Sequence, residues 1–278
     1  MHTFSLPEAL AFAQQLARQA AAVTRSLTAP PSFQRKADNS PVTEADRRIQ
    51  RIIAQAIAER YPDHAFLGEE TIDDAPPLPA PGQSDYCWVV DPLDGTRNFT
   101  HGFPIICTSI ALLKGPQPIV GLIHEHNSGW QCSAVQGGGV TCCGTGFPAC
   151  RMTGWKAGPT PPDQSDIIIA VPSARNQPTL PVIRSWLDKY VLRNVGCTAL
   201  HMAYVATGAV DAAHCLECKL WDVAAGYLLI TAAGGRCTDL SGHPLLTQDP
   251  AQCAQRDFPF FAASPAVYDQ LFNEMNGA

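Results

Sequence analysis

Two aspartates, Asp91 and Asp94, stand three positions apart directly after the apolar residues Trp88 to Val90. Pro92 fixes one backbone angle between them, so their carboxylates are held in a constrained turn. Two anions at one site repel each other, and proteins reconcile them by raising one pKa or by binding a cation between them. The segment is therefore either an acid–base pair or a cation site.

More acidic residues in other parts of the chain favour the cation. Glu69 and Glu70 follow a short apolar stretch, and Asp222 stands at the start of a predicted helix. None of these acidic segments contains histidine or cysteine, and oxygen ligands alone are typical of a hard ion such as Mg²⁺. The sequence predicts a magnesium site assembled from distant segments.

Gly95 and Thr96 add a place for an anion. They precede a predicted helix start at Arg97, where free backbone N–H groups and the positive helix end attract phosphate. A phosphate beside clustered carboxylates needs metal ions between them, which indicates metal-assisted hydrolysis of a phosphoester. In that chemistry the Thr96 hydroxyl orients the attacking water and a carboxylate takes its proton.

Several of these residues also have a purely structural interpretation. Asp94 and Gly95 form a common turn sequence, and Asp222 can complement the dipole of its own helix. Asp46 is spaced as the capping partner of Thr43 at another helix start. The conjunction of the acidic segments, rather than any one of them, favours the metal site.

The elements that must position these residues are a mixture of helices and strands. Capping signals and apolar periodicity predict a helix from Ser5 to about Leu27 and a second one after Pro41, with residues 34–40 as a loop or hairpin between them. Further helices are predicted over 198–207 and 222–233. Strands are predicted over residues 65–67, 86–90, 105–113, 119–124, 130–135, 167–171 and 210–215. Residues 75–82 are rich in proline and predict a surface loop.

Short Gly-Pro and Ser-Gly turns between residues 86 and 135 indicate antiparallel pairing, whereas helices and strands alternate after residue 166. The change predicts a mixed α/β (α+β) protein in two subdomains, residues 1–160 and 161–278, with a boundary near 152–165. Acidic segments fall at the ends of strands or the starts of helices, where open sheets place their ligand sites.

Composition excludes several classes of protein. The chain has 278 residues, of which 46% are hydrophobic and 16% charged, so disordered and fibrous classes are set aside. Its net charge of −6 gives no general attraction for nucleic acid or anionic lipid. The N-terminus lacks the pattern of a secretion signal and no apolar run is long enough to span a bilayer, so we expect a cytoplasmic protein without membrane or nucleic-acid partners.

The 11 cysteines are scattered and odd in number, in a chain too large to need a disulfide framework. Two close pairs, Cys142 with Cys143 and Cys215 with Cys218, suggest a zinc or redox site, but neither has the matching second half of such a motif. The sequence favours reduced thiols that pack as small hydrophobic groups.

The acidic motifs resemble those of the inositol monophosphatase family, a group of lithium-sensitive, magnesium-dependent phosphomonoesterases. The resemblance runs from Lys36 to Gly235. Four segments carry it in the family's order: 40–46 (SPVTEAD), 68–70 (GEE), 88–99 (WVVDPLDGTRNF) and 221–226 (WDVAAG). It implies a layered αβαβα sugar-phosphatase fold and a homodimer.

The resemblance also implies roles for individual residues. The ligands that it implies for two to three Mg²⁺ ions are Glu69, Asp91, the carbonyl of Leu93, Asp94 and Asp222. Asp46 and Thr96 would act on the nucleophilic water with Glu69 assisting, and Gly95 and Thr96 would bind phosphate through their amides. Lys36 is similar in placement to a basic residue near the family's site, and it can equally be a solvated surface lysine.

The substrate side departs from the family pattern. The candidate substrate contacts are Asp94, Gly196, Thr198, Glu217 and Asp222. Residues 196–200 resemble the small-residue stretch that borders the family's sugar ring, but the carboxylate expected seven positions before Asp222 is replaced by Cys215. Glu217 can substitute only with a shift along the strand of about 6 to 7 Å.

The resemblance and the residues together predict a Mg²⁺-dependent phosphomonoesterase that acts on a small polyol, sugar or amino-alcohol phosphate. Inositol-1-phosphate heads the candidates, followed by histidinol phosphate or a broad set of small phosphoesters, and then a bisphosphorylated nucleotide. The alternative from another class is a regulatory binding protein that retains the fold.

Overall fold

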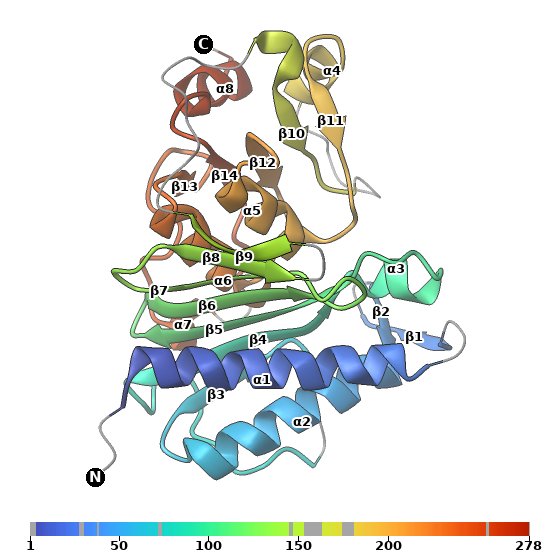
Figure 1. Ribbon diagram of the computed structural model, residues 1–278, viewed down its shortest axis with the longest axis vertical. Coiled ribbons are helices and arrows are strands. Elements are labelled where there is room, and N and C mark those ends of the chain that lie inside the picture. The colour runs from blue at the N-terminus through green and yellow to red at the C-terminus, as the bar shows by residue number, and fades with distance from the viewer. Residues whose placement is uncertain are drawn as a thin grey trace.

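Two sheets with helices on their faces organise the chain in the computed structural model (Figure 1). The structure describes residues 4–27, 31–37, 39–71, 74–144, 147–152, 163–173, 181–253 and 256–277. Within these ranges the layers follow the order helix, sheet, helix, sheet, helix, which confirms the predicted αβαβα arrangement.

The first helical layer consists of α1 (Leu6–Arg25) and α2 (Glu44–Arg60), which lie along one face of the larger sheet (Figure 1). Ser5 caps α1 by accepting a hydrogen bond from the Glu8 N–H at 3.3 Å. The alanine stripe of α1 and the isoleucines of α2 are buried against strands β4 to β6. Both predicted helices are confirmed, and α1 ends two residues before the predicted limit.

The larger sheet has the strand order β3-β4-β5-β6-β7-β8-β9, with only β3 and β4 parallel. Its strands are β3 (Ala65–Gly68), β4 (Tyr86–Asp94), β5 (Cys107–Lys114), β6 (Gln117–Glu125), β7 (Gln131–Val135), β8 (Val140–Gly144) and β9 (Phe147–Met152). The prediction missed β8 and β9, because their cysteines, threonine and glycine show no clear apolar alternation. It also ended β4 at Val90, whereas the strand continues through an irregularity in its pairing with β5 between Asp91 and Asp94.

Two helices, α5 (Thr198–Thr207) and α6 (Leu220–Ala232), form the layer between the sheets. Nine of the 13 residues of α6 are buried, because the helix packs on β4 to β7 as well as on α5. The prediction placed α5 correctly. It began α6 two residues late, so Asp222 is the third residue of the helix rather than its first.

The smaller sheet has the order β11-β10-β12-β14-β13 and mixes parallel with antiparallel pairs. Its strands are β10 (Ile168–Ala170), β11 (Val191–Arg193), β12 (Ala212–Cys215), β13 (Arg236–Thr238) and β14 (Phe260–Ala263). The outer helices α4 (Val182–Leu187) and α8 (Tyr268–Met275) cover it. The remaining short elements are the hairpin strands β1 (Phe33–Arg35) and β2 (Pro41–Thr43), the helices α3 (Thr96–Thr100) and α7 (Pro250–Cys253), and the 3₁₀ turn η1 (Gln164–Asp166).

Most of the predicted subdomain boundary, residues 153–162, lies outside the described residues. The division at residue 160 therefore stays a prediction. None of the helices in the described ranges combines the length and the apolar character that crossing a membrane requires.

Candidate active site

Four carboxylates predicted as metal ligands interact with one another in the structure. Glu69 follows β3 and lies beside β4, where its N–H donates to the Val90 carbonyl at 3.2 Å. Asp91 interacts with Glu69, Asp94 and Asp222. Asp222 belongs to α6, which follows the strands of the larger sheet much later in the chain. The fold thus brings acidic groups from three distant segments into one cluster.

Burial and mutual repulsion raise the pKa values of three of these carboxylates, those of Asp91, Asp94 and Asp222. Burial first, and then the charge of Glu69, raise the pKa of Asp91 well above its usual range. Burial followed by the charge of Asp222 has the same effect on the pKa of Asp94. For Asp222, burial and Glu69 raise the pKa to about 7. Without a cation these three carboxylates therefore take up protons at a higher pH than exposed aspartates do.

Backbone N–H groups orient three of these carboxylates. The Leu93 N–H donates to Asp91 Oδ1 at 2.9 Å, and the Ala199 N–H at the start of α5 donates to Asp94 Oδ2 at 2.7 Å. At the start of α6 the Lys219 N–H donates to Asp222 Oδ2 at 2.6 Å. Asp222 therefore caps its helix and belongs to the cluster at the same time, so the two interpretations of this residue are compatible.

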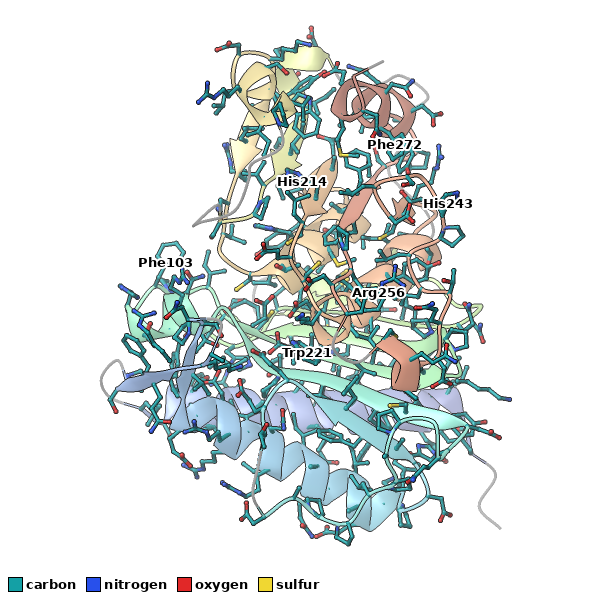
Figure 2. The ribbon with its side chains drawn as sticks, turned by 180° about the vertical axis from the view of Figure 1, so that it is seen from behind. Phe103, His214, Trp221, His243, Arg256 and Phe272 are labelled. Atoms are coloured by element: carbon teal, nitrogen blue, oxygen red, sulfur yellow. The ribbon has the colours of Figure 1, made fainter. Side chains whose placement is uncertain are left out.

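The start of α6 is also tied to the larger sheet. Ser109 in β5 donates a hydrogen bond from its hydroxyl to the Trp221 carbonyl at 3.2 Å. Trp221 lies where the C-terminal part of the chain meets this sheet (Figure 2). The contact fixes the neighbouring Asp222 relative to the acidic residues of β4.

The residues of the cluster fit a hard divalent cation. Every ligand implied by the family pattern offers oxygen, and among the described contacts the only hydrogen-bond partner of the Leu93 carbonyl is Thr96 Oγ1 at 3.0 Å, whose single proton is shared with Asp46. A carbonyl oxygen has a second lone pair for a metal. Buried carboxylates with raised pKa values are stabilised when a cation replaces their protons.

Removing the metal should make stability depend on pH with a defined sign. Because the folded-state pKa values are raised, the protonated cluster stabilises the metal-free protein below about pH 4, and this contribution is lost as the pH rises through about 7 for Asp222. We expect the Tm in chelator to fall between about pH 5 and 8, and the gain from Mg²⁺ to grow over the same interval. Calorimetry with chelator or Mg²⁺ measures both, and a Mg²⁺ gain independent of pH would contradict the assignment.

Asp46 and Thr96 form the predicted pair for handling water. Thr96 Oγ1 donates to Asp46 Oδ1 at 2.8 Å, while Asp46 Oδ2 accepts from the Thr43 N–H at 2.8 Å and from the Thr43 hydroxyl. Burial raises the pKa of Asp46, which is only 1% exposed. The capping box predicted at α2 is present, and the same carboxyl group reaches Thr96 with its other oxygen.

Gly95 makes the turn between β4 and α3. Its φ of +91° lies in the left-handed region, and a Cβ at this position would meet Cys197 Sγ and the Ile105 carbonyl, the latter at 3.0 Å. Only glycine fits here without strain. Because α3 is a single turn, its dipole is small, so a phosphate beside Gly95 and Thr96 would depend on the individual N–H groups.

Lys36 is not a freely solvated surface residue. Its Nζ lies 2.6 Å from Glu69 Oε1 and 2.5 Å from Glu70 Oε1, and the side chain is 23% exposed. Burial lowers the pKa of Lys36, but the two carboxylates outweigh it, so the net pKa lies above the ordinary value.

The buried amide of Gln50, which the sequence did not suggest, holds the Glu70 backbone by accepting from its N–H at 2.7 Å and donating to its carbonyl.

The sequence also gave no sign of a buried chain of hydrogen bonds that supports the acidic turn. The Thr108 hydroxyl donates to the Pro92 carbonyl at 2.8 Å and so must accept from His126 Nε2, also at 2.8 Å. His126 Nδ1 then accepts from the Thr24 hydroxyl of α1 at 2.9 Å. Burial lowers the pKa of His126 to about 3, which keeps the ring neutral. No sequence signal links these three residues, because they are far apart in the chain.

Replacing Thr108 by the isosteric valine should destabilise the protein. The substitution leaves the Pro92 carbonyl and the His126 N–H without partners in a buried site, at a cost of about 1–3 kcal/mol. Chemical denaturation measures the change. Thr207→Val is the matched control, because its hydroxyl bonds only the Tyr204 carbonyl within α5. Equal losses in both variants would contradict a special role for Thr108.

The predicted substrate residues Gly196, Thr198 and Glu217 line one pocket of about 140 Å³. The complete lining is Pro172, Ser173, Gly196, Cys197, Thr198, His201, Cys215 and Glu217. Cys215 hydrogen-bonds with Cys218, which lowers the pKa of the Cys215 thiol. Asp94 and Asp222 do not line this pocket, but the bond from Ala199 to Asp94 places the acidic cluster next to it.

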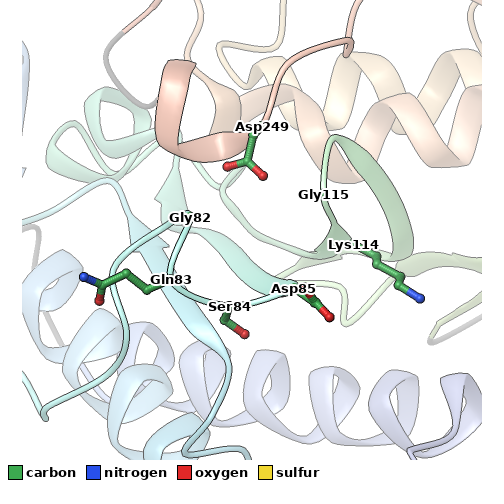
Figure 3. Close-up of a pocket in the computed structure, with 7 residues that line it drawn as sticks. All are labelled: Gly82, Gln83, Ser84, Asp85, Lys114, Gly115 and Asp249. Carbon is green, nitrogen blue, oxygen red and sulfur yellow. The ribbon is translucent and has the colours of Figure 1, made fainter.

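A second cavity of about 640 Å³ lies elsewhere, at the end of β5 (Figure 3). Its lining residues are Gly82, Gln83, Ser84, Asp85, Lys114, Gly115 and Asp249. None of the residues predicted to act in catalysis, metal binding or substrate binding is among them. The residues predicted to carry the chemistry therefore lie in the acidic cluster and in the smaller pocket beside it.

The ten cysteines whose side chains the structure describes are free, and all of them except Cys143 are buried. This agrees with the prediction that they pack as reduced thiols. The acidic segments contain no cysteine in the sequence, but the fold places Cys107 and Cys197 beside Asp94. Because Cys107 and Cys197 lie outside the acidic segments of the sequence, their contact with Asp94 could not be predicted from it.

Comparisons with known proteins agree with the geometry. The sequence matches the Inositol monophosphatase family over residues 5–263. It is 30% identical to inositol monophosphatase 1 of Xenopus laevis over 72% of this chain and 70% of that protein, and 29% identical to the human protein of the same name over 73% and 72%.

Two solved structures share the fold over almost the whole chain. An IMPase of Thermotoga maritima has a TM-score of 0.80 at 25% identity and 97% coverage of both chains. The extragenic suppressor protein suhB of Bartonella henselae has a TM-score of 0.78 at 26% identity, covering 96% of this chain and 98% of the other. The chain therefore belongs to the inositol monophosphatase family and is a phosphoric monoester hydrolase.

Proposed function

We propose that this enzyme hydrolyses a small polyol phosphate, with inositol-1-phosphate as the first candidate, in a reaction that depends on two to three Mg²⁺ ions. The observation that carries the proposal is the convergence of Glu69, Asp91, Asp94 and Asp222 beside the hydrogen-bonded pair of Thr96 and Asp46. An acidic pocket of this kind repels a phosphate unless cations are present. Relatives named inositol monophosphatase support the substrate class.

The protein's own residues would divide the work between binding and proton transfer. Bound Mg²⁺ would neutralise the phosphate charge and make water a better nucleophile. Glu69, Asp91, the Leu93 carbonyl, Asp94 and Asp222 would hold the ions. The Gly95 and Thr96 N–H groups would orient the phosphate.

Proton transfer would run through Thr96. Its hydroxyl donates to Asp46, so its oxygen can accept a hydrogen bond from the attacking water. As the water oxygen bonds to phosphorus and the ester P–O bond breaks, the water proton would pass to Thr96 and the Thr96 proton to Asp46, while the leaving alkoxide would take a proton from solvent. The raised pKa of Asp46 makes this carboxylate a stronger base than an exposed one. Glu69, whose charge acts on Asp46, would assist.

Histidinol phosphate is the second candidate, because the substrate pocket lacks the carboxylate expected for a polyol. Cys215 occupies that position, and Glu217 places an exposed carboxylate at the pocket where an ammonium group could pair with it. Phosphate release from inositol-1-phosphate, histidinol phosphate and a bisphosphorylated nucleotide, with Mg²⁺, without it and with competing Li⁺, ranks the candidates. Equal turnover of all esters would indicate a broad phosphatase, and release without Mg²⁺ would refute the proposed chemistry.

Cys215→Glu should favour the polyol. A carboxylate at this position would accept hydrogen bonds from substrate hydroxyls, so KM for inositol-1-phosphate should fall about tenfold, the effect of one charged hydrogen bond. Cys215→Ser is the control, since it changes the sulfur without adding a charge. A KM that is unchanged, or lowered equally in both variants, would show that the hydroxyls of the substrate do not reach Cys215.

The homodimer, the cytoplasmic location and the division into subdomains at residue 160 remain predictions. The assignment of individual residues to catalysis and metal binding is likewise proposed, and the substitutions described below test it.

A further inference from the structure

Two buried thiols lie against Asp94 on the side of β5 and α5. Cys107 is the residue directly opposite Asp94 in the β4–β5 pairing, with its Sγ 4.0 Å from Asp94 Oδ2. Cys197 is the N-cap residue of α5, and its Sγ lies 3.4 Å from the Asp94 carbonyl oxygen. One ligand atom from each of the three residues falls within 4.8 Å of the others.

We propose that Asp94, Cys107 and Cys197 form a second metal site, one that takes a thiophilic divalent cation of the Zn²⁺ or Cd²⁺ class. Two sulfurs and one carboxylate oxygen are a donor set that selects such ions over Mg²⁺. Zinc binds sulfur at about 2.3 Å, so two sulfurs around one tetrahedral ion lie roughly 3.8 Å apart. The spacing of the three side chains accommodates this geometry with small side-chain adjustments.

The surrounding backbone preorganises the three ligands. Cys197 Sγ lies 3.2 Å from the Ile105 carbonyl as well as near the Asp94 carbonyl, so oxygen for a fourth ligand is at hand. Gly95 gives the sulfur its space, because a Cβ there would collide with Cys197 Sγ. Cys107 and Asp94 are fixed by a strand pair rather than by a loop. Ligands on rigid elements lose little freedom on binding.

Another close thiol pair of the described chain belongs to no comparable cluster with a carboxylate. Cys132 Sγ and Cys142 Sγ lie 3.0 Å apart on neighbouring strands β7 and β8, where no described carboxylate joins them in a comparable cluster. This pair therefore gives a matched control for thiol chemistry that does not involve Asp94.

The second site shares Asp94 with the proposed magnesium cluster. An ion held by the two thiols would draw the Asp94 carboxylate away from Mg²⁺, so a thiophilic cation should inhibit hydrolysis. Binding itself does not depend on the proposed function, whereas inhibition does. The two statements can therefore fail separately.

Co²⁺ titration of the full-length enzyme tests binding. The protein is kept reduced with a phosphine and treated with chelator beforehand. Thiolate coordination gives Co²⁺ an intense near-ultraviolet charge-transfer band, whereas an all-oxygen site gives only weak visible bands. We expect one equivalent to produce the intense band in the wild type and in the Cys132→Ala, Cys142→Ala double variant. The band should fall at least about fivefold in Cys107→Ala and in Cys197→Ala.

If Cys107→Ala does not fold, as judged by circular dichroism, Cys107→Ser replaces it, since the hydroxyl keeps the size and is a poor ligand for Co²⁺. Absence of the band in the wild type, its persistence in both cysteine variants, or its loss only in the Cys132 and Cys142 double variant would overturn the site.

Phosphate release in the presence of Zn²⁺ tests the competition. The Zn²⁺ concentration for half inhibition, measured relative to each variant's own activity, should rise about tenfold or more in Cys107→Ala. It should not change in the double control. If the wild type shows the charge-transfer band with Co²⁺ but is not inhibited by Zn²⁺, the metal site is supported and its competition with Mg²⁺ is refuted.

Discussion

Asp94→Asn should reduce phosphate release by at least about 10³-fold at saturating Mg²⁺, because it removes one charged oxygen of the proposed metal site, where metal charge would stabilise the transition state. Asp94 connects the two parts of the site. Its carboxylate belongs to the acidic cluster and also accepts from the Ala199 N–H next to the substrate pocket. Initial rates with the best ester of the substrate screen measure the effect.

The fold itself should survive this substitution. Asparagine keeps an oxygen that can accept from Ala199, and the loss of one charge relieves repulsion within the cluster. We therefore expect the metal-free Tm to stay the same or rise, while the gain from Mg²⁺ shrinks. Asp85→Asn is the matched control, because this exposed residue lines the distant cavity of Figure 3. Activity above a tenth of the wild type in Asp94→Asn would refute the role of the cluster.

Thr96→Val should lower kcat by about 10²–10⁴-fold, the range for loss of general acid–base assistance. Valine has nearly the shape of threonine but cannot donate to Asp46 or accept from water. Because we propose that the hydroxyl acts on the attacking water rather than on the substrate, KM should change far less than kcat. Steady-state kinetics at saturating Mg²⁺ separate the two constants.

Two comparisons make the result specific to the hydroxyl. Thr96→Ser keeps the hydroxyl and should retain most of kcat. Thr100→Val removes a hydroxyl that bonds the Arg97 carbonyl at the other end of α3, so it tests the effect of valine on this short helix. A similar loss of kcat in Thr96→Val and Thr100→Val would point to disruption of α3 rather than to proton transfer.

Local patterns predicted the parts of the site that depend on neighbours in the chain. The capping box of Thr43 and Asp46 is a four-residue signal, and it formed as expected. The acidic turn after β4 and the start of α6 were likewise recognisable from composition and apolar periodicity. These patterns predicted the elements that carry the acidic residues, whereas the layered fold was predicted from the resemblance to the inositol monophosphatase family.

Non-local contacts escaped prediction because no local pattern encodes them. The support of Pro92 by Thr108 and His126 depends on how two strands pair and on where α1 crosses them. The thiols beside Asp94 meet it through strand register and the N-cap of α5. Strands β8 and β9 lack clear alternation, so only their pairing with the sheet defines them.

The position of α6 between the two sheets has a consequence for biosynthesis. Asp222 reaches the acidic residues of β4 only after α6 has docked on the larger sheet. A nascent chain that has emerged from the ribosome only as far as β9 carries most of the acidic groups but not this one. Enzymatic competence should therefore appear abruptly, once the C-terminal third has been translated and packed, rather than build up gradually as the polypeptide lengthens.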